Sequence, residues 1–168
     1  MELLVREVGP EDAEEIVNIL NPIIEAGEYT VLDTPLTIQE EREFIINFPK
    51  RGVFHVAERV EDGRIVGFQS LEPFATYTHV FDHVAIMGTY VDLSLRRRGI
   101  GKRLSMVTFE AALSKGFEKI FTYIRAGNTE ALASYLKLGF RIAGTAHKQV
   151  KFEGKYEDEI IVEKFLSA

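Results

Sequence analysis

The sequence has no cysteine among its 168 residues, so it offers neither a disulfide framework nor a thiol nucleophile. It also has no apolar run long enough to span a bilayer. Its first residues, Met1 to Glu7, lack the basic start and the long apolar centre of a signal peptide. Neither His79 nor His147 stands at a metal-ligand spacing, so no metal is expected. These absences predict a cytoplasmic protein without membrane attachment.

The charge balance argues against general nucleic-acid binding, which depends on a basic surface. Acidic residues outnumber basic residues by 26 to 20, and the net charge is -6. The length and the hydrophobic fraction of 46% fit one globular domain, residues 1–168, with a substantial core. A confined basic patch within this acidic chain suits a polyanionic small molecule better than a polymer. Its members are Arg96, Arg97, Arg98, Lys102 and Arg103.

The basic patch lies in a segment, Val91 to Leu104, that reads as the end of a strand, a glycine turn and the start of a helix. Free backbone N–H groups and the positive end of the helix dipole would stand there beside the cationic side chains. The segment therefore predicts a pyrophosphate-binding turn. The alternative is an ordinary helix start with solvated arginine and lysine side chains.

Two better-known phosphate-binding motifs do not fit this segment. The nucleotide-triphosphate loop requires Ser or Thr after Gly-Lys, but Arg103 follows Gly101 and Lys102. The dinucleotide fingerprint requires a third glycine where Leu104 stands. A nucleotide-binding module is accordingly disfavoured.

The pattern [Q/R]-x-x-G-x-[G/A], filled by Arg96, Gly99 and Gly101, resembles the acetyl-CoA-binding motif of the GCN5-related N-acetyltransferase (GNAT) superfamily. The segment from Asn128 to Phe140 resembles the second signature of this family. It has an asparagine after a strand, a short helix that carries a tyrosine, and a closing Gly-Phe pair. Two motifs in the family's order make the resemblance far more specific than either motif alone.

The resemblance and the hydrophobic pattern together predict an α/β fold of the α+β kind: one GNAT-like domain with a mixed, mostly antiparallel sheet flanked by helices. Pro22 is expected to end or kink the first helix, and Gly116 to end the helix after the basic turn. Predicted strands are 3–8, 53–60, 65–71, 84–93, 119–124, a strand starting at 140–143, and 157–165. Predicted helices are 10–21, 38–47, one from the basic turn to about 116, and one between 128 and 139.

The resemblance implies acetyl-CoA as cosubstrate and assigns its contacts. Backbone N–H groups at the end of the strand, at Thr89, Tyr90 and Val91, would receive the acetyl carbonyl. Asn128 would touch the pantetheine arm or, alternatively, cap the following helix. The pyrophosphate would lie against Arg96, Arg97, Arg98, Gly99, Ile100, Gly101 and Lys102.

The resemblance assigns one catalytic residue and leaves another open. The resemblance makes Tyr135 the general acid for the departing thiolate, whereas the alternative is a tyrosine that only packs. The chain is also similar to the phosphinothricin (methionine sulfone and sulfoximine) acetyltransferase branch in its Asp33 to Thr37 segment and its length. That branch carries a glutamate on the strand before the glycine turn, but Ile86 stands at that place.

The general base therefore has to be sought among nearby residues, and the candidates are Asp82, His83 and Glu72. His83 has an ordinary pKa suited to accepting a proton near neutrality. The aromatic residues of the loop before Asp82, together with two residues near position 28, are expected to wall the acceptor pocket or, alternatively, to cover the core or a dimer contact. The residues concerned are Phe74, Tyr77, Phe81, Glu28 and Tyr29.

The predicted function is direct transfer of acetyl from acetyl-CoA to a primary amine of a small molecule such as an amino-acid analogue. One alternative is a protein N-terminal or lysine acetyltransferase, and another is a coenzyme A-binding sensor without catalysis. A homodimer is one expected arrangement, and no nucleic-acid partner is expected.

Overall fold

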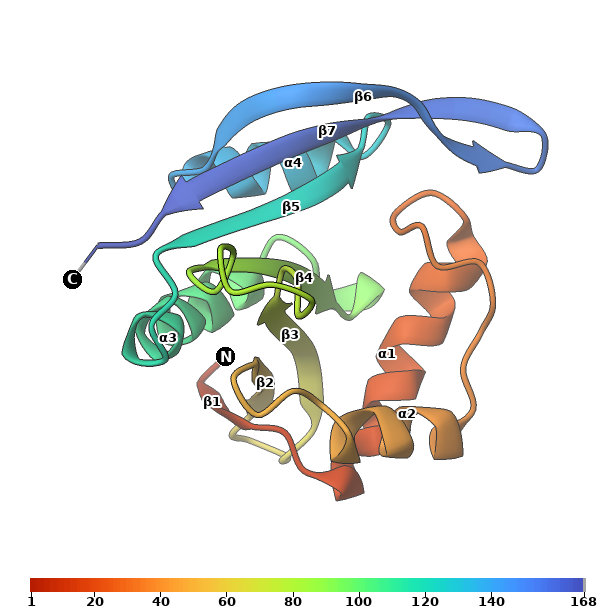
Figure 1. Cartoon of the computed structure of the whole chain (residues 1–168). Helices are drawn as coiled ribbons and strands as arrows, with labels where there is room; N and C mark the ends of the chain where they lie inside the picture. The colour runs from red at the N-terminus through yellow and green to blue at the C-terminus, as the bar shows by residue number, and fades with distance from the viewer. Residues whose placement is uncertain (168) are drawn as a thin grey trace.

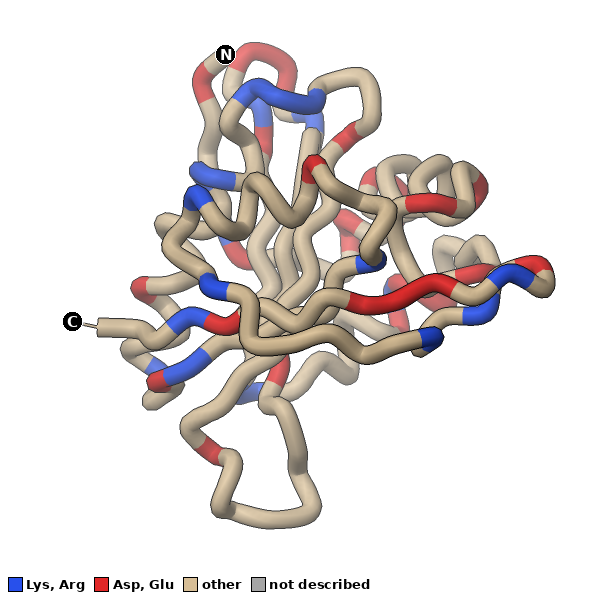
Figure 2. Tube along the Cα trace, turned by 90° about the horizontal axis from the view of Figure 1, so that it is seen from above, with Lys and Arg blue, Asp and Glu red and all other residues tan. Residues whose placement is uncertain are grey.

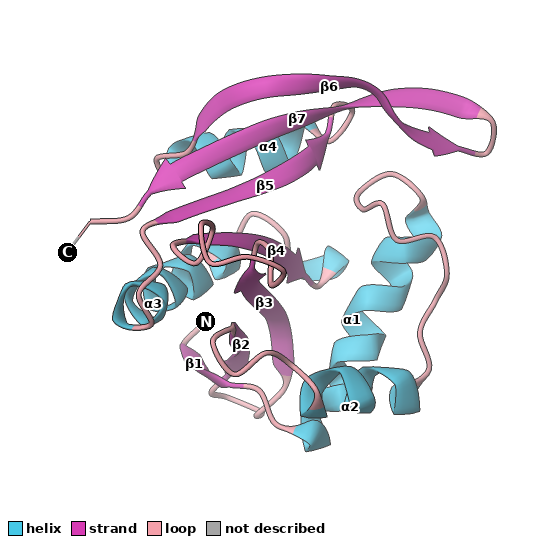
Figure 3. Cartoon of the chain, in the orientation of Figure 1, coloured by secondary structure: helices cyan, strands magenta, loops and turns pink. Residues whose placement is uncertain are grey.

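The computed structural model describes residues 1–167, which form a central sheet with helices on both sides (Figures 1 and 3). Its seven strands follow the order β1-β2-β3-β4-β5-β7-β6, and within these residues β4 and β5 make the one parallel pair. The mixed, mostly antiparallel sheet that was predicted is confirmed. The strands are β1 (Leu3–Glu7), β2 (Val53–Arg59), β3 (Ile65–Pro73), β4 (Val84–Val91), β5 (Lys119–Arg125), β6 (Arg141–Phe152) and β7 (Lys155–Phe165).

Four α-helices and two short 3-10 turns are found in the described part of the chain. Helices α1 and α2 pack on one face of the sheet, against Phe54, Phe68 and Tyr90, while α3 packs on the other face. Figure 1 shows α4 beside β5 and β7. The elements are η1 (Pro10–Asp12), α1 (Ala13–Ala26), α2 (Ile38–Ile46), η2 (Leu93–Leu95), α3 (Ile100–Ser114) and α4 (Thr129–Lys137).

Two predicted boundaries are wrong, the end of the first helix and the end of the strand before the glycine turn. Helix α1 passes through Pro22 and ends at Ala26, because Ile23 and Ile24 continue its buried face. Gly27 caps it with a φ of +73°. Strand β4 ends at Val91 rather than two residues later, where η2 begins. The strand predicted to start within 140–143 does so at Arg141, and as β6 it runs for 12 residues because it forms a hairpin with most of β7.

The pairing between β4 and β5 is short, and this positions the functional site. The two strands pair only from Val84 to Ile86, with Lys119 to Phe121 as partners. Beyond that, the Thr122 hydroxyl donates to the Met87 carbonyl at 2.8 Å. The last residues of β4 therefore face a gap in the sheet rather than a neighbouring strand.

Within residues 1–167, every helix is too short or too polar to cross a membrane. Acidic and basic residues are interspersed along the chain trace (Figure 2). The run of three arginines, from Arg96 to Arg98, lies between η2 and α3, in the turn that joins β4 to α3.

Candidate active site

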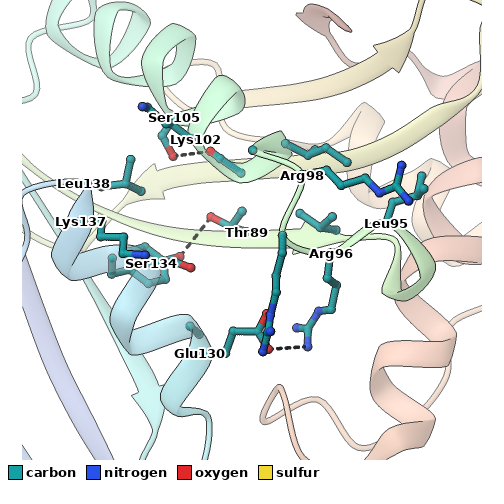
Figure 4. A pocket seen from close by; sticks show the side chains of 17 residues that line it. Thr89, Leu95, Arg96, Arg98, Lys102, Ser105, Glu130, Ser134, Lys137 and Leu138 are labelled. Atoms are coloured by element: carbon teal, nitrogen blue, oxygen red, sulfur yellow. Dashed lines mark hydrogen bonds and ion pairs between the residues drawn. The ribbon is translucent and has the colours of Figure 1, made fainter. Parts of the chain in front are cut away.

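A cavity of about 340 Å³ lies at the end of β4, between the start of α3 and one face of α4 (Figure 4). We call it the basic cavity. It brings together most of the predicted cosubstrate contacts and the predicted acid, although these come from three separate elements. They are Thr89, Val91, Arg96, Arg97, Arg98, Gly99, Ile100, Gly101, Lys102 and Tyr135.

The turn that enters α3 exposes unpaired backbone amides. Gly99 caps the helix with a φ of +77°, and a Cβ built there would meet no atom within 4 Å. The first helical hydrogen bond runs from the Arg103 amide to the Gly99 carbonyl at 3.0 Å. The amides of Ile100, Gly101 and Lys102 therefore have no helical acceptor, and the positive end of the helix dipole adds to their attraction for an anion. These residues fit a pyrophosphate group.

A carboxylate from α4 spans the mouth of this cavity. Glu130 lies 3.2 Å from Arg97 and 3.7 Å from Arg96. Figure 4 shows Glu130 beside Arg96. The Arg96 guanidinium also stacks over the Tyr29 ring at 4.2 Å, which ties the turn to the loop after α1. Two of the cations that would meet phosphate are thus paired with Glu130 in this structure.

The backbone of β4 aims its amides alternately to its two sides. The Asp92 amide donates to the Val66 carbonyl at 3.0 Å, so even-numbered residues at this end of β4 pair with β3. The amides of Thr89 and Val91 point the other way, into the gap that β5 leaves. The Tyr90 amide points toward β3, so of the three predicted amides two can reach a group in the gap.

Tyr135, on α4, places its hydroxyl 3.1 Å from the Thr89 hydroxyl. Burial raises the pKa of Tyr135 to about 12, and the hydrogen bond with Thr89 opposes part of that rise. The phenol is therefore protonated at neutral pH and lines the basic cavity, as a proton donor to a thiolate must.

Asn128 fills the alternative role that the sequence left open. Its side-chain oxygen accepts from the Ala131 amide at 3.2 Å, which caps α4. Its amide nitrogen donates to the Tyr29 carbonyl at 3.4 Å. Asn128 does not line the basic cavity.

The structure does not bring Asp82 and His83 to Tyr135. Both are exposed in the loop before β4, and the Asp82 carboxylate lies 3.0 Å from the His79 ring. His83 and Thr89 are six residue steps apart along the extended strand, a span of roughly 20 Å.

Two other carboxylates lie on the opposite side of the sheet, beside the side chain of Tyr90. The Tyr90 ring stacks on Phe68 with centroids 4.9 Å apart, and burial raises its pKa, with smaller contributions from the charges of Glu41 and Glu72. Glu72 lies on β3, opposite Ile86, and burial raises its pKa. We call this side, with Glu41, Glu72 and Tyr90, the carboxylate face.

Glu41 is the functional candidate that the sequence analysis missed. Glu41 lies on α2, and 4% of its surface is exposed. None of the described residues forms an ion pair or side-chain hydrogen bond with its carboxylate. Burial raises its pKa to about 7. Its signal was present in the sequence, because Glu41 stands four residues before the apolar Ile45 and so lies on the same face of the helix.

Comparison with known proteins agrees with this geometry. The acetyltransferase (GNAT) family matches residues 14–140. A Bacillus subtilis protein named as a candidate phosphinothricin acetyltransferase, YwnH, is 26% identical over 156 residues, which cover 93% of this chain and 94% of that protein. The predicted resemblance to the phosphinothricin acetyltransferase branch is confirmed.

Two solved structures show the same fold. Ribosomal-protein-alanine N-acetyltransferase from Brucella melitensis has a TM-score of 0.89 and 26% identity, covering 97% of this chain and 99% of that one. A phosphinothricin acetyltransferase from Sinorhizobium meliloti in complex with acetyl-CoA has a TM-score of 0.90 and 20% identity, covering 99% and 90%. The chain therefore belongs to the acetyltransferase (GNAT) family and is an acetyl-CoA-dependent N-acetyltransferase.

Proposed function

We propose that this enzyme transfers acetyl from acetyl-CoA directly to a primary amine of a small molecule. One observation carries the proposal: a single cavity joins the amides of the glycine turn, the free amides of β4 and the hydroxyl of Tyr135. The names of the relatives point to amino-acid analogues such as phosphinothricin as the first acceptors to test.

Each protein group has a defined task in this reaction. The amides after Gly99, with the neighbouring arginines, bind the pyrophosphate, and the amides of Thr89 and Val91 donate to the carbonyl oxygen as negative charge develops there. The amine nitrogen forms a bond to the carbonyl carbon, and the bond from that carbon to sulfur breaks. Tyr135 then gives its proton to the departing thiolate.

The proton that leaves the amine needs an acceptor on the other side of the gap. We assign it to Glu41 or Glu72, through water, rather than to Asp82 or His83. A base works best when its pKa lies near the working pH, and the pKa of Glu41 is about 7.

A protein N-terminus is the second candidate acceptor. It is favoured by the similarity to ribosomal-protein-alanine N-acetyltransferase. The chemistry would be unchanged, because an N-terminal amine is also a primary amine, but the acceptor would continue as a peptide.

The test is a thermal shift with acetyl-CoA, coenzyme A, ATP and NAD in parallel, followed by thiol release with phosphinothricin, a diamine and a peptide that begins with alanine. A ligand at 100 times its dissociation constant should add about 2.7 kcal/mol of stability. We expect shifts with the coenzyme A compounds alone and thiol release with a small amine. Thiol release with the peptide alone would select the second candidate, and no shift with acetyl-CoA would contradict the proposal.

A further inference from the structure

A buried glutamine lies directly behind the basic cavity. Gln69 on β3 is fully buried and faces Thr89 across the β3–β4 pair. Its side-chain nitrogen donates to the Thr89 hydroxyl at 2.8 Å and to the Ser105 hydroxyl at 2.9 Å. Gln69 does not line the cavity, so it can act there only through these two hydroxyls.

Packing does not explain a glutamine at this position. Its side-chain oxygen is buried without a hydrogen-bond partner among residues 1–167, which destabilises the folded chain. Its neighbours on the same face of β3, Gly67 and Leu71, carry no polar side chain. An apolar side chain would suit this face better unless the amide nitrogen serves the site.

The available donors and acceptors fix the direction at Ser105 and favour one direction at Thr89. The Ser105 hydroxyl donates to the Gly101 carbonyl at 2.8 Å, so it accepts from Gln69. The Thr89 hydroxyl also accepts from Gln69, which leaves its own proton to donate. The Tyr135 oxygen lies 3.1 Å from the Thr89 oxygen, a distance that suits either hydroxyl as the donor, and the Thr89 proton is available for this contact.

This direction decides where the proton of Tyr135 points. If Thr89 donates to the phenol oxygen, the O–H group of Tyr135 cannot point back at Thr89 and turns toward the cavity. The same donation stabilises the phenolate that remains after the proton has left, since a hydrogen bond to the charged form favours that form.

We infer that Gln69 is a positioning residue, which sets the Thr89 hydroxyl as donor to Tyr135 and so presents the Tyr135 proton to the thiolate. The inference rests on the proposed role of Tyr135 as the acid. Gln69 itself touches no substrate atom in this account.

A double-mutant cycle on the whole chain tests this role. We expect Gln69→Leu to lower kcat by roughly tenfold, a part of the 10² to 10⁴ that a general acid typically contributes. The KM for acetyl-CoA should stay within about twofold of that of the unmodified enzyme, because the contacts that bind acetyl-CoA before the reaction are unchanged. In a Tyr135→Phe background the same substitution should cost nothing further, because the group it positions is gone.

Thr89→Val is the second variant, because it keeps the shape of Thr89 and removes the hydroxyl. It should reproduce both results even if Gln69→Leu folds poorly. Gln39→Leu, the same change on the exposed side of α2, should leave kcat unchanged.

The outcomes separate this inference from the proposed function. Losses that add in the Tyr135→Phe background, or full activity in Gln69→Leu, would overturn the positioning role and leave the acetyltransferase assignment intact. Absence of thiol release by the unmodified chain would overturn both.

Discussion

The two faces of the sheet at the end of β4 are built in different ways. The basic cavity takes most of its groups from one stretch of chain, from Thr89 to Ser105, and its attraction for anions comes from backbone amides and arginines. The carboxylate face joins Glu41, Glu72 and Tyr90 from three elements, and burial raises the pKa of each. The basic cavity suits an anionic cosubstrate, and the carboxylate face suits an amine that gives up a proton.

The largest effect should come from Gly99→Glu in the basic cavity. The new carboxylate would face the pyrophosphate, and juxtaposed like charges should weaken acetyl-CoA binding by roughly 100-fold or more. Calorimetric titration with acetyl-CoA measures this directly. Gly154→Glu is the matched control, since Gly154 has a φ of +79°, against +77° at Gly99, and equally open surroundings. Equal affinity in both variants would remove the pyrophosphate assignment.

Tyr135→Phe should separate chemistry from binding in the same cavity. Loss of the acid should lower kcat by about 10² to 10⁴, with the dissociation constant of acetyl-CoA nearly unchanged. Steady-state rates and titration together measure the split. Tyr156→Phe, on the exposed β6–β7 hairpin, serves as the control. Full activity in Tyr135→Phe would reduce Tyr135 to a packing residue.

Glu41→Gln tests the carboxylate face. If Glu41 accepts the proton, the rate of the unmodified enzyme falls as the pH drops below about 7, which gives the pH–rate profile an acidic limb. The variant should lose this limb, and its kcat should fall by about 10². Glu43→Gln, exposed on the same helix, should keep the limb. A limb that survives in Glu41→Gln would transfer the role to Glu72.

The same variant should change stability with pH. The pKa of Glu41 is higher in the folded chain than its ordinary value of 4.5, so ionisation opposes folding increasingly as the pH rises from 4.5 to 7. Glu41→Gln should therefore raise Tm at pH 8 and change it little at pH 4.5. Thermal melts at the two pH values measure this, and equal shifts would contradict the burial of an unpaired carboxylate.

The smallest effect should come from Glu130→Gln. The substitution frees Arg96 and Arg97 at the mouth of the basic cavity. Exposed ion pairs contribute little, so acetyl-CoA should bind only about two- to fivefold more tightly. Titration measures the gain, with Glu110→Gln on the exposed side of α3 as the control. Weaker binding would show that Glu130 holds the arginines in place for the cosubstrate.

The contrast between the faces also explains what the sequence could predict. The glycine turn and the β4 amides lie within one contiguous segment, where spacing along the chain corresponds to spacing in the fold. Tyr135 could be named because it lies in the segment that resembles the second family signature, and that signature follows the glycine turn in the family's order. The sheet followed from apolar alternation in the strands, which is a local pattern.

The remaining features depend on contacts between distant segments. Glu41 reaches the carboxylate face only because α2 packs against α1 and places the Phe44 ring against Phe54 of β2. Gln69 meets Thr89 through strand register, which hydrophobic alternation alone does not specify to the residue. The continuation of α1 past Pro22 depends on its buried face, which outweighs the local tendency of proline to end a helix.

The central claim is that acetyl-CoA and the amine are bound at the same time, on opposite sides of the gap beside β4. Initial rates measured while both substrates are varied test it most directly. Intersecting double-reciprocal lines are the expected result, because direct transfer requires both substrates together. Parallel lines would indicate an acetylated enzyme intermediate and would contradict the account.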